Sequence, residues 1–386
     1  MIVLKFGGSS LASVNQIKNV AKKVVQERKT EKKIVVVVSA MGKTTDNLIK
    51  EANAFGKNIS KSVLDRLLNL GELKSVFLLT LALDELNEKV CALNGGEAGI
   101  IVGGNFGNGF IKSINTNIID GVFKKHDIVV VAGFCGKTEK GEVITLGRGG
   151  SDTTAVALAS AFNCKCTIYT DVCAISTLDP RIFADAKKYN KINFDDMLEF
   201  SAFGAKVLET RCVEIAKKNK TEICLTKKNS KNKTIISDNF ENLGVCGIGK
   251  VDNIGELNLI FNKEKSGDVF NLLKENVSKI FMLDMIFNEK EIKLKIAIFN
   301  IELQNIAEKL QKIAKSVSFK YGLAIVTIIG FGWCCHVQNL IEMLFLTIKN
   351  NIKFYKTSQT ERVFNILCNE KDALDNMRYL KELLNL

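Results

Sequence analysis

One stretch, ITLGRGGSDTTAVALASA at residues 144–161, constrains the fold of this chain more than any other. It predicts the end of a strand, a glycine turn and the start of a helix, because glycines permit positive φ values and good helix-starting residues follow them. Such a turn aims backbone N–H groups and the positive end of a helix dipole at a ligand, which is usually an anion. The turn also carries one cation, Arg148, and one carboxylate, Asp152, and a turn built only for packing has little use for both.

Strands alternate with helices from the N-terminus to about residue 235, which predicts an α/β fold with a mainly parallel sheet and helices on both faces. The strands expected from apolar runs are residues 2–6, 33–39, 89–93, 127–132, 166–170 and 222–225, the last being the final strand of this half. We expect helices from Asp46 onward, over residues 67–83 with a break at Gly71-Glu72, and over residues 201–216. The glycine-rich residues 95–110 suit a hairpin or flap.

With 386 residues, the chain should contain two or three domains. A polar segment at residues 229–242 marks the predicted boundary, so the first domain is expected at residues 1–240. The last run of the chain reads β-α-β-β-α, with strands at residues 323–329, 352–357 and 363–368. The segment before it is a rougher copy, with strands at residues 257–261, 280–286 and 292–299. Together they predict two small ferredoxin-like α+β units at residues 245–318 and 319–386.

The composition is that of a globular protein, with 46% hydrophobic and 25% charged residues. No apolar run approaches the ~20 residues that a membrane span needs. The N-terminus has no basic region before an apolar core, so we expect no signal peptide and a cytoplasmic location.

The chain has a net charge of +12 and 11 cysteines, and each of these two features has a functional and a structural interpretation. Lysine is spread along the whole chain, which favours a solvated surface over a nucleic-acid site, although the charge also helps to attract an anionic nucleotide. The cysteines are odd in number and lack zinc spacing, which favours free thiols. The cluster Cys334-Cys335-His336 is interpreted as packing rather than a metal site.

Polar residues gather after several of the predicted strands, where open α/β sheets bind ligands. Lys5, on the first strand, needs an anion nearby if it is buried, although a tight turn alone would also explain the glycines after it. Glu72 has apolar flanks and is either a site residue or a surface glutamate. Two GKT tripeptides, at residues 42–44 and 136–138, are not P-loops, because valines occupy the positions where the loop requires its first glycine. The cations and glycine turns at these positions indicate a phosphotransferase, and the absence of a P-loop means that it does not use a Walker motif.

The motifs resemble those of the aspartate kinases, members of the amino-acid kinase superfamily. They are KFGGSS at residues 5–10, VSAMGKTTD at 38–46, TLGRGGSDTTA at 145–155, YTD at 169–171, DPR at 179–181 and FGAKVL at 203–208. The resemblance spans about residues 2–240. It implies a three-layer αβα sandwich of the carbamate kinase type, followed by two ACT units. It also implies transfer of the ATP γ-phosphoryl group to the β-carboxylate of L-aspartate, the first step toward lysine (through diaminopimelate), threonine and methionine.

The same resemblance assigns roles by position. Lys5 is expected to neutralise the transferring phosphoryl group, and Asp152 to orient Lys5 and the nucleophile. The expected aspartate-binding residues are Thr45, Glu72, Arg148, Gly149, Gly150 and Ser151, with Glu72 receiving the α-ammonium and Arg148 the α-carboxylate. The expected ATP-binding residues are Lys5, Phe6, Gly7, Gly8, Thr170, Asp171, Ser176, Asp179, Pro180, Arg181 and Lys206. Mg²⁺ is expected to bridge the phosphates, with no protein ligand identified.

The ACT units imply a homodimer or higher homo-oligomer and a feedback amino acid, lysine or threonine. This chain departs from the family in three places: residues 261–268 lack the usual proline, residues 330–336 form a bulkier turn, and the flap at residues 107–111 has lost an arginine. Two alternatives stay open at this point. One is another amino-acid kinase, acting on glutamate, acetylglutamate or a nucleotide, and the other is a non-catalytic amino-acid sensor. No membrane or nucleic-acid partner is expected.

Overall fold

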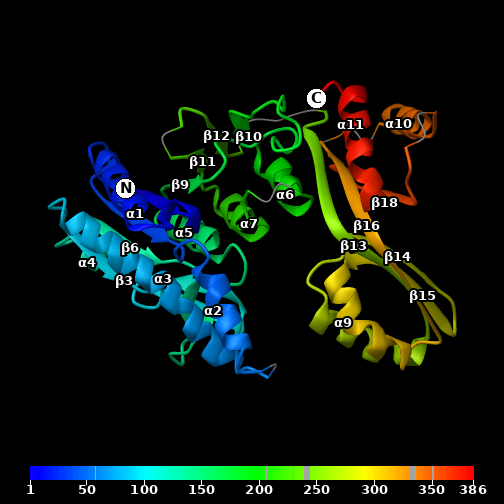
Figure 1. The fold of residues 1–386 in the computed structure, drawn as a ribbon, viewed down its shortest axis with the longest axis horizontal. Helices are drawn as coiled ribbons and strands as arrows, with labels where there is room; N and C mark the ends of the chain where they lie inside the picture. The colour runs from blue at the N-terminus through cyan, green and yellow to red at the C-terminus, as the bar shows by residue number, and fades with distance from the viewer. Residues whose placement is uncertain are drawn as a thin grey trace. The chain divides into compact units, whose positions relative to one another are not determined.

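The computed structural model describes residues 1–56, 58–204, 207–228, 230–238, 244–330, 332, 336–349 and 352–386. These residues form two compact units (Figure 1). The first unit comprises Met1–Ser176, Lys188–Ser201 and Lys206–Glu241, and the second comprises Thr177–Lys187, Ala202–Ala205 and Asn242–Leu386.

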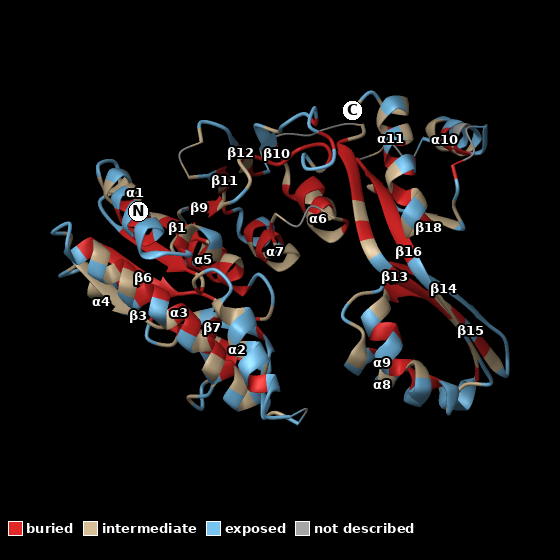
Figure 2. Cartoon of the chain, viewed as in Figure 1, coloured by how far each residue is buried: buried red, intermediate tan, exposed pale blue. Residues whose placement is uncertain are grey.

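A sheet with the strand order β10-β12-β11-β9-β1-β2-β6-β3 forms the centre of the first unit. Its strands are β1 (Ile2–Phe6), β2 (Ile34–Val38), β3 (Val90–Leu93), β6 (Ile128–Ala132), β9 (Lys165–Thr170), β10 (Lys191–Ile192), β11 (Ile223–Lys227) and β12 (Lys233–Ile236). All the pairs are parallel except β11 with β12. Figure 2 shows the central strands buried, as expected for apolar strands covered on both faces.

The register of the central strands brings their carboxyl ends to one edge of the sheet. Phe6 at the end of β1 lies opposite Val38 in β2 and Tyr169 in β9, and Val38 lies opposite Ala132 in β6. The turns that follow β1, β2, β6 and β9 therefore lie at the same edge. This edge holds most of the predicted site.

Helices cover both faces of this sheet. They are α1 (Val14–Arg28), α2 (Thr44–Asn53), α3 (Lys61–Asp84), α4 (Thr116–Val122), α5 (Gly150–Ala161), α6 (Phe194–Ala202) and α7 (Thr210–Asn219). Side chains of α1 and α3 share a core cluster with Leu4 and Phe6 of β1. Alternate residues of a strand point to opposite faces, so Val3 and Lys5 point away from this cluster. Helix α5 packs against β1, β2 and β9 on that second face, which completes three layers.

A smaller sheet with the order β5-β4-β7-β8 adjoins these layers. Its strands are β4 (Ile100–Asn105), β5 (Asn108–Ile114), β7 (Cys135–Lys137) and β8 (Val143–Thr145). Strands β4 and β5 form the predicted hairpin, with its tip at residues 106–107, and β8 leads directly into the glycine turn before α5.

A single sheet also organises the second unit, with the order β14-β15-β13-β16-β18-β17. Its elements are β13 (Gly247–Asn262), α8 (Ser266–Asn276), β14 (Met282–Phe287), β15 (Glu291–Phe299), α9 (Asn300–Gln311), β16 (Ser316–Ile329), α10 (Val337–Lys349), β17 (Lys356–Gln359), β18 (Val363–Asn369) and α11 (Ala373–Leu383). The two long strands, β13 and β16, each pair in both halves of the sheet. In the proposed division into ACT-like units at residues 245–318 and 319–386, β13 therefore belongs to the first unit but also pairs with the β16 residues of the second.

Two helix predictions were wrong. Helix α3 runs through Gly71 and Glu72 without a break, because Gly71 is a close-packing position inside the helix rather than a helix end. The predicted helix over residues 201–216 is two helices, α6 and α7. Gly204 has a φ of +132°, and Glu209 adopts an extended N-cap conformation, so the chain leaves the helix between them.

Two strand predictions were also wrong. The strand expected at residues 352–357 begins only at Lys356, and β11 is followed by a further strand, β12. Strand β12 is only four residues long (KTII) and lies in a lysine- and asparagine-rich segment, which concealed it. The cysteines that the structure describes are free thiols, and Cys334 and Cys335 lie outside the described residues.

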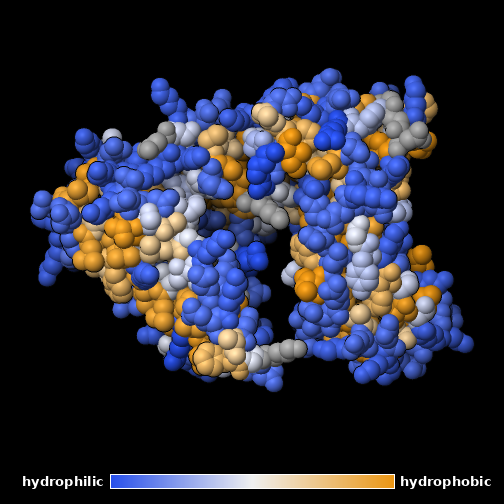
Figure 3. Space-filling view, viewed as in Figure 1, coloured by the Kyte–Doolittle hydropathy of each residue, from blue (hydrophilic) through white to orange (hydrophobic). Residues whose placement is uncertain are grey.

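Apolar side chains gather on the outward face of α3, as the space-filling view shows (Figure 3). Val63, Leu70, Phe77 and Leu81 on this helix are each more than half exposed. Among the described helices, none is both long and apolar enough to cross a membrane.

Candidate active site

An ion pair between Lys5 and Asp152 lies at the carboxyl edge of the sheet. Lys5 Nζ lies 2.6 Å from Asp152 Oδ1, and their side chains are only 10% and 13% exposed. Lys5 points from β1 toward α5, and Asp152 stands in the first turn of α5, where the helix dipole favours a carboxylate. The first turn of α5, next to the glycine turn, therefore supplies the anion that a buried lysine requires.

The turn after β1 places two glycine backbones beside this pair. A Cβ atom on Gly7 would lie 3.5 Å from Lys5 Nζ, so the ammonium sits close to the Gly7 backbone. A Cβ atom on Gly8 would lie 2.7 Å from the carbonyl oxygen of Ala40, and the N–H of Gly42 donates to the Gly8 carbonyl at 3.0 Å. Only glycine fits at position 8, where the turns after β1 and β2 meet.

Glu72 is buried beneath the turn that follows β2. Its side chain comes from α3, is 3% exposed, and accepts a hydrogen bond from the N–H of Ala40 at 3.2 Å through Oε1. The other oxygen, Oε2, is buried and has no hydrogen-bond partner among the described residues. Burial raises the pKa of Glu72 to about 7, although the hydrogen bond from Ala40 acts in the opposite direction.

The close approach of α3 to this turn depends on Gly71. A Cβ atom there would lie 3.0 Å from Ala40 Cβ and 3.3 Å from Thr44 Cγ2. The neighbouring carboxylate thereby comes within hydrogen-bond reach of the Ala40 backbone. A buried acceptor without a partner is costly, so Glu72 Oε2 is suited to receive a cationic ligand group.

The glycine turn holds Arg148 at the surface and Ser151 inside. Gly147 and Gly149 have φ values of +76° and +66°, and Gly149 is the N-cap of α5. Arg148, between them, is exposed, whereas Ser151 is 8% exposed and packs so closely on Gly133 that a Cβ there would lie 2.8 Å from Ser151 Oγ. The turn therefore presents one guanidinium outward, next to a buried ion pair.

Comparison with known proteins identifies the family of this chain. The model of the amino acid kinase family matches residues 1–227. An aspartokinase of Geobacillus stearothermophilus is 35% identical, the match covering 100% of this chain and 97% of that protein. An aspartokinase of Helicobacter pylori is 34% identical over 97% of this chain and 96% of its own length. This chain belongs to the aspartokinases.

A solved structure extends the likeness to the fold of an aspartokinase over its whole length. Crystalline E. coli aspartokinase III in complex with aspartate and ADP superimposes with a TM-score of 0.80 and 21% identity, covering all of both chains. The fold class predicted from the sequence, an amino-acid kinase sandwich followed by ACT-like units, is confirmed.

The structure brings together most of the residues predicted for an aspartokinase site in the first unit. Lys5, Phe6, Gly7, Gly8 and Asp152 form its centre, with Gly149, Gly150 and Ser151 in the adjoining turn. Thr45 is half-buried in the first turn of α2. At the end of β9, Thr170 donates to Asp171 Oδ1 at 2.9 Å, and the Tyr169 ring before it stacks on Phe6 with centroids 4.6 Å apart. Ser176 Oγ is buried without a hydrogen-bond partner among the described residues.

The remaining predicted ATP-binding residues belong to the second unit or lie outside the described residues. Asp179, Pro180 and Arg181 belong to the second unit, where Arg181 donates to both carboxylate oxygens of Asp179 and lowers the pKa of that carboxyl. The peptide bond before Pro180 is trans. Lys206 lies outside the described residues. The roles of these four residues toward ATP stay predictions.

Sequence reasoning missed two polar side chains of the first unit, Asp65, which is buried, and Arg211, which is half-buried. Asp65, on α3, accepts hydrogen bonds from the N–H groups of Gly107 and Thr145, both at 2.9 Å. Arg211, on α7, donates to the carbonyl oxygens of Gly109 and Leu146. Asp65 could have been found from its position seven residues before Glu72, on the same face of a helix. Arg211 was assigned to a helix that the structure does not form.

Proposed function

We propose that the Lys5–Asp152 site transfers the γ-phosphoryl group of ATP to the β-carboxylate of L-aspartate, giving 4-phospho-L-aspartate and ADP. The observation that carries the proposal is the buried Lys5 ammonium at the sheet edge, next to the Gly7-Gly8 backbone and 2.6 Å from Asp152. A carboxylate oxygen of aspartate forms the new bond to phosphorus. The bond to the β,γ-bridging oxygen breaks, and ADP leaves with its electron pair.

The site has little need of a general base, because the nucleophile is already an anion. Catalysis then depends on neutralising charge and on holding two anions in line. Lys5 supplies the cation and Asp152 holds it in place. The backbone N–H groups of Gly7 and Gly8 would serve the phosphate oxygens.

Aspartate would be recognised by its two α-substituents. The α-ammonium would pair with Glu72 Oε2, which satisfies the acceptor that is otherwise buried without a partner. The α-carboxylate would bind the exposed guanidinium of Arg148, whose fork suits two parallel hydrogen bonds. Thr45 and Ser151 would complete the pocket.

Mg²⁺ would reach this site on the phosphates of ATP. The described residues contain no group of three or more His, Cys, Asp or Glu side chains that would hold a metal. The scarcity of protein ligands fits Mg²⁺, because this ion keeps several waters and uses few protein ligands when phosphates bind it. The ion would neutralise phosphate charge that Lys5 alone does not cover.

An acceptor series tests the proposal. The full chain is incubated with MgATP and, in turn, aspartate, glutamate, N-acetylglutamate and a nucleoside monophosphate, and ADP release is followed with a coupled assay. We expect release with aspartate only. ADP release with only another acceptor would show that the chain has a different amino-acid kinase activity. Aspartate binding without any ADP release would show that the chain is a sensor.

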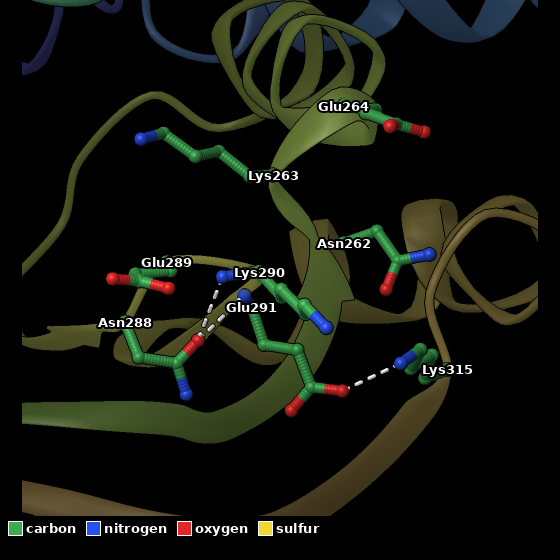
Figure 4. Close-up of a pocket in the computed structure, with 8 residues that line it drawn as sticks. All are labelled: Asn262, Lys263, Glu264, Asn288, Glu289, Lys290, Glu291 and Lys315. Atoms are coloured by element: carbon green, nitrogen blue, oxygen red, sulfur yellow. Dashed lines mark hydrogen bonds and ion pairs between the residues drawn. The ribbon is translucent and has the colours of Figure 1, made fainter.

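The feedback ligand is a second part of the proposal. The loop after β13 lines an open cavity of about 1080 Å³ in the second unit (Figure 4). Its rim carries both charges, including an ion pair between Lys315 and Glu291, and such a rim suits a zwitterionic amino acid. A crystal structure of E. coli aspartokinase III contains lysine and aspartate. Titrating lysine, threonine and both together into the assay would show which ligand inhibits.

The oligomeric state and the cytoplasmic location are further predictions. A homodimer or larger homo-oligomer is consistent with the exposed apolar face of α3 and with the family's ACT-like units. Light scattering of the purified chain, with and without lysine or threonine, measures the state directly.

A further inference from the structure

The guanidinium of Arg211 joins two loops of the first unit. Its Nη1 donates to the carbonyl oxygens of Gly109 at 2.8 Å and Leu146 at 3.0 Å, and its Nη2 donates to Asn108 Oδ1 at 3.3 Å. Asn108 and Gly109 begin β5 at the tip of the hairpin, and Leu146 begins the glycine turn. One side chain on α7 therefore connects the hairpin to the turn that carries Arg148.

The same two segments also touch each other directly and are held from a second side. A Cβ atom on Gly147 would lie 3.3 Å from the carbonyl oxygen of Gly107. Asp65 accepts from the N–H of Gly107 and from both the N–H and the hydroxyl of Thr145, each at 2.9 Å. Asp65 thus fixes the hairpin and β8 to α3, while Arg211 fixes the hairpin and the turn to α7.

The glycine turn needs such external restraints. Gly147 and Gly149 both have positive φ values, and glycine loses more conformational freedom on ordering than any other residue. Arg148 is exposed and stands between them, so its position depends on the backbone of the turn. A displacement of about 1 Å in a positioning group can cost a factor of about 100 in rate.

We infer that Arg211 is a positioning residue for aspartate: it sets the turn that aims Arg148 at the substrate α-carboxylate. This inference rests on the proposed function. Arg211 would act through the backbone of the turn, since its guanidinium donates hydrogen bonds to the hairpin and to Leu146. This role of Arg211 also makes the hairpin tip part of the aspartate-binding site, although the tip contains no arginine.

The test is steady-state kinetics on three variants of the full chain. Arg211→Ala and Arg211→Lys remove two or more of the three hydrogen bonds, and Asn108→Ala removes one without altering α7. For both Arg211 variants we expect the KM for aspartate to rise about tenfold or more, while the KM for ATP stays within about twofold. Asn108→Ala should give a smaller rise in the same direction. Lys217→Ala is the control, because Lys217 lies on the same helix and pairs with Asp195 at the surface.

A second measurement separates positioning from general damage to the fold. Guanidinium ion at millimolar concentration should lower the KM for aspartate of Arg211→Ala and leave Arg211→Lys and the wild type unchanged. Equal increases in both KM values, or a KM for aspartate that matches the Lys217→Ala control, would overturn the inference. Absence of aspartate-dependent ADP release from the wild type would instead overturn the proposed function.

Discussion

Lys5 Nζ and Asp152 Oδ1 lie 2.6 Å apart, although 147 positions of sequence separate the two residues, and both side chains are largely buried. A parallel sheet explains how they meet. Strand β1 is central, its carboxyl end adjoins the turn before α5, and Lys5 points to the face that α5 covers. The pair couples stability to function, because each residue is the charge that allows the other to be buried.

Removing Lys5 should separate these two roles. We expect Lys5→Ala to lower kcat by a factor of about 10² or more, because it removes a cation from the reacting phosphoryl group. It should also lower the free energy of unfolding by about 3 kcal/mol, because Asp152 is left buried and unpaired. Lys23→Ala is the matched control, since Lys23 forms a partly exposed pair with Glu27 that should contribute less than about 1 kcal/mol.

A double variant completes this test. Lys5→Met combined with Asp152→Asn leaves no unpaired charge at these two positions, so it should recover part of the lost stability without recovering turnover. Urea unfolding and the coupled assay on the same preparations measure both quantities. Turnover close to wild type in Lys5→Ala would show that the reacting centre lies elsewhere.

Glu72 should make aspartate use depend on pH. Its pKa of about 7 means that the carboxyl of the substrate-free enzyme is mostly protonated below pH 7, and only the carboxylate pairs well with an ammonium. The kcat/KM for aspartate should therefore rise as the pH passes through about 7 and level off at higher pH. Glu72→Gln should raise the KM for aspartate about tenfold or more and abolish this step.

The same pKa predicts a pH-dependent stability with the opposite trend. The pKa of the Glu72 carboxyl is about 7 in the folded chain but about 4.5, its ordinary value, in the unfolded chain, so folding takes up a proton between these pH values. Stability relative to Glu72→Gln is therefore greatest below pH 4.5 and falls as pH rises to 7. The loss reaches about 3 kcal/mol above pH 7. Asp84→Asn, an exposed change on the same helix, should show no such trend in urea titrations.

The fold followed from apolar strands and glycine turns, and the centre of the site followed from motifs. Lys5 and Asp152 were predictable because a charged residue on an apolar strand and a carboxylate in an anion-binding turn both require a partner. Asp65 and Arg211 were not, because their partners are backbone groups of a hairpin whose position depends on tertiary packing. The break between α6 and α7 was missed for a similar reason: Gly204 packs against the backbone of Lys250 in the second unit, a contact with no local signal.

Removing Mg²⁺ should stop catalysis without unfolding the chain. Because the described residues contain no metal-binding cluster, the ion should contribute to the ATP complex and not to the apo fold. Excess EDTA should abolish ADP release, and excess Mg²⁺ should restore it. The melting temperature without ATP should change by less than about 1 °C. A large fall in that temperature would reveal a structural metal instead.

Gly8 should tolerate no side chain, whereas another glycine of the first unit should tolerate one easily. The Cβ of Gly8→Ala would lie 2.7 Å from the Ala40 carbonyl oxygen, which belongs to backbone and is held by the turn above Glu72. The variant should therefore displace that turn, lose most activity and melt several degrees lower. Gly121→Ala is the matched control: Gly121 lies in α4 with no atom within 4 Å of its added Cβ. Because alanine favours a helix over glycine by about 0.5–1 kcal/mol, this control should keep full activity and melt slightly higher. Equal behaviour of the two variants would show that the contact between the turns after β1 and β2 does not shape the site.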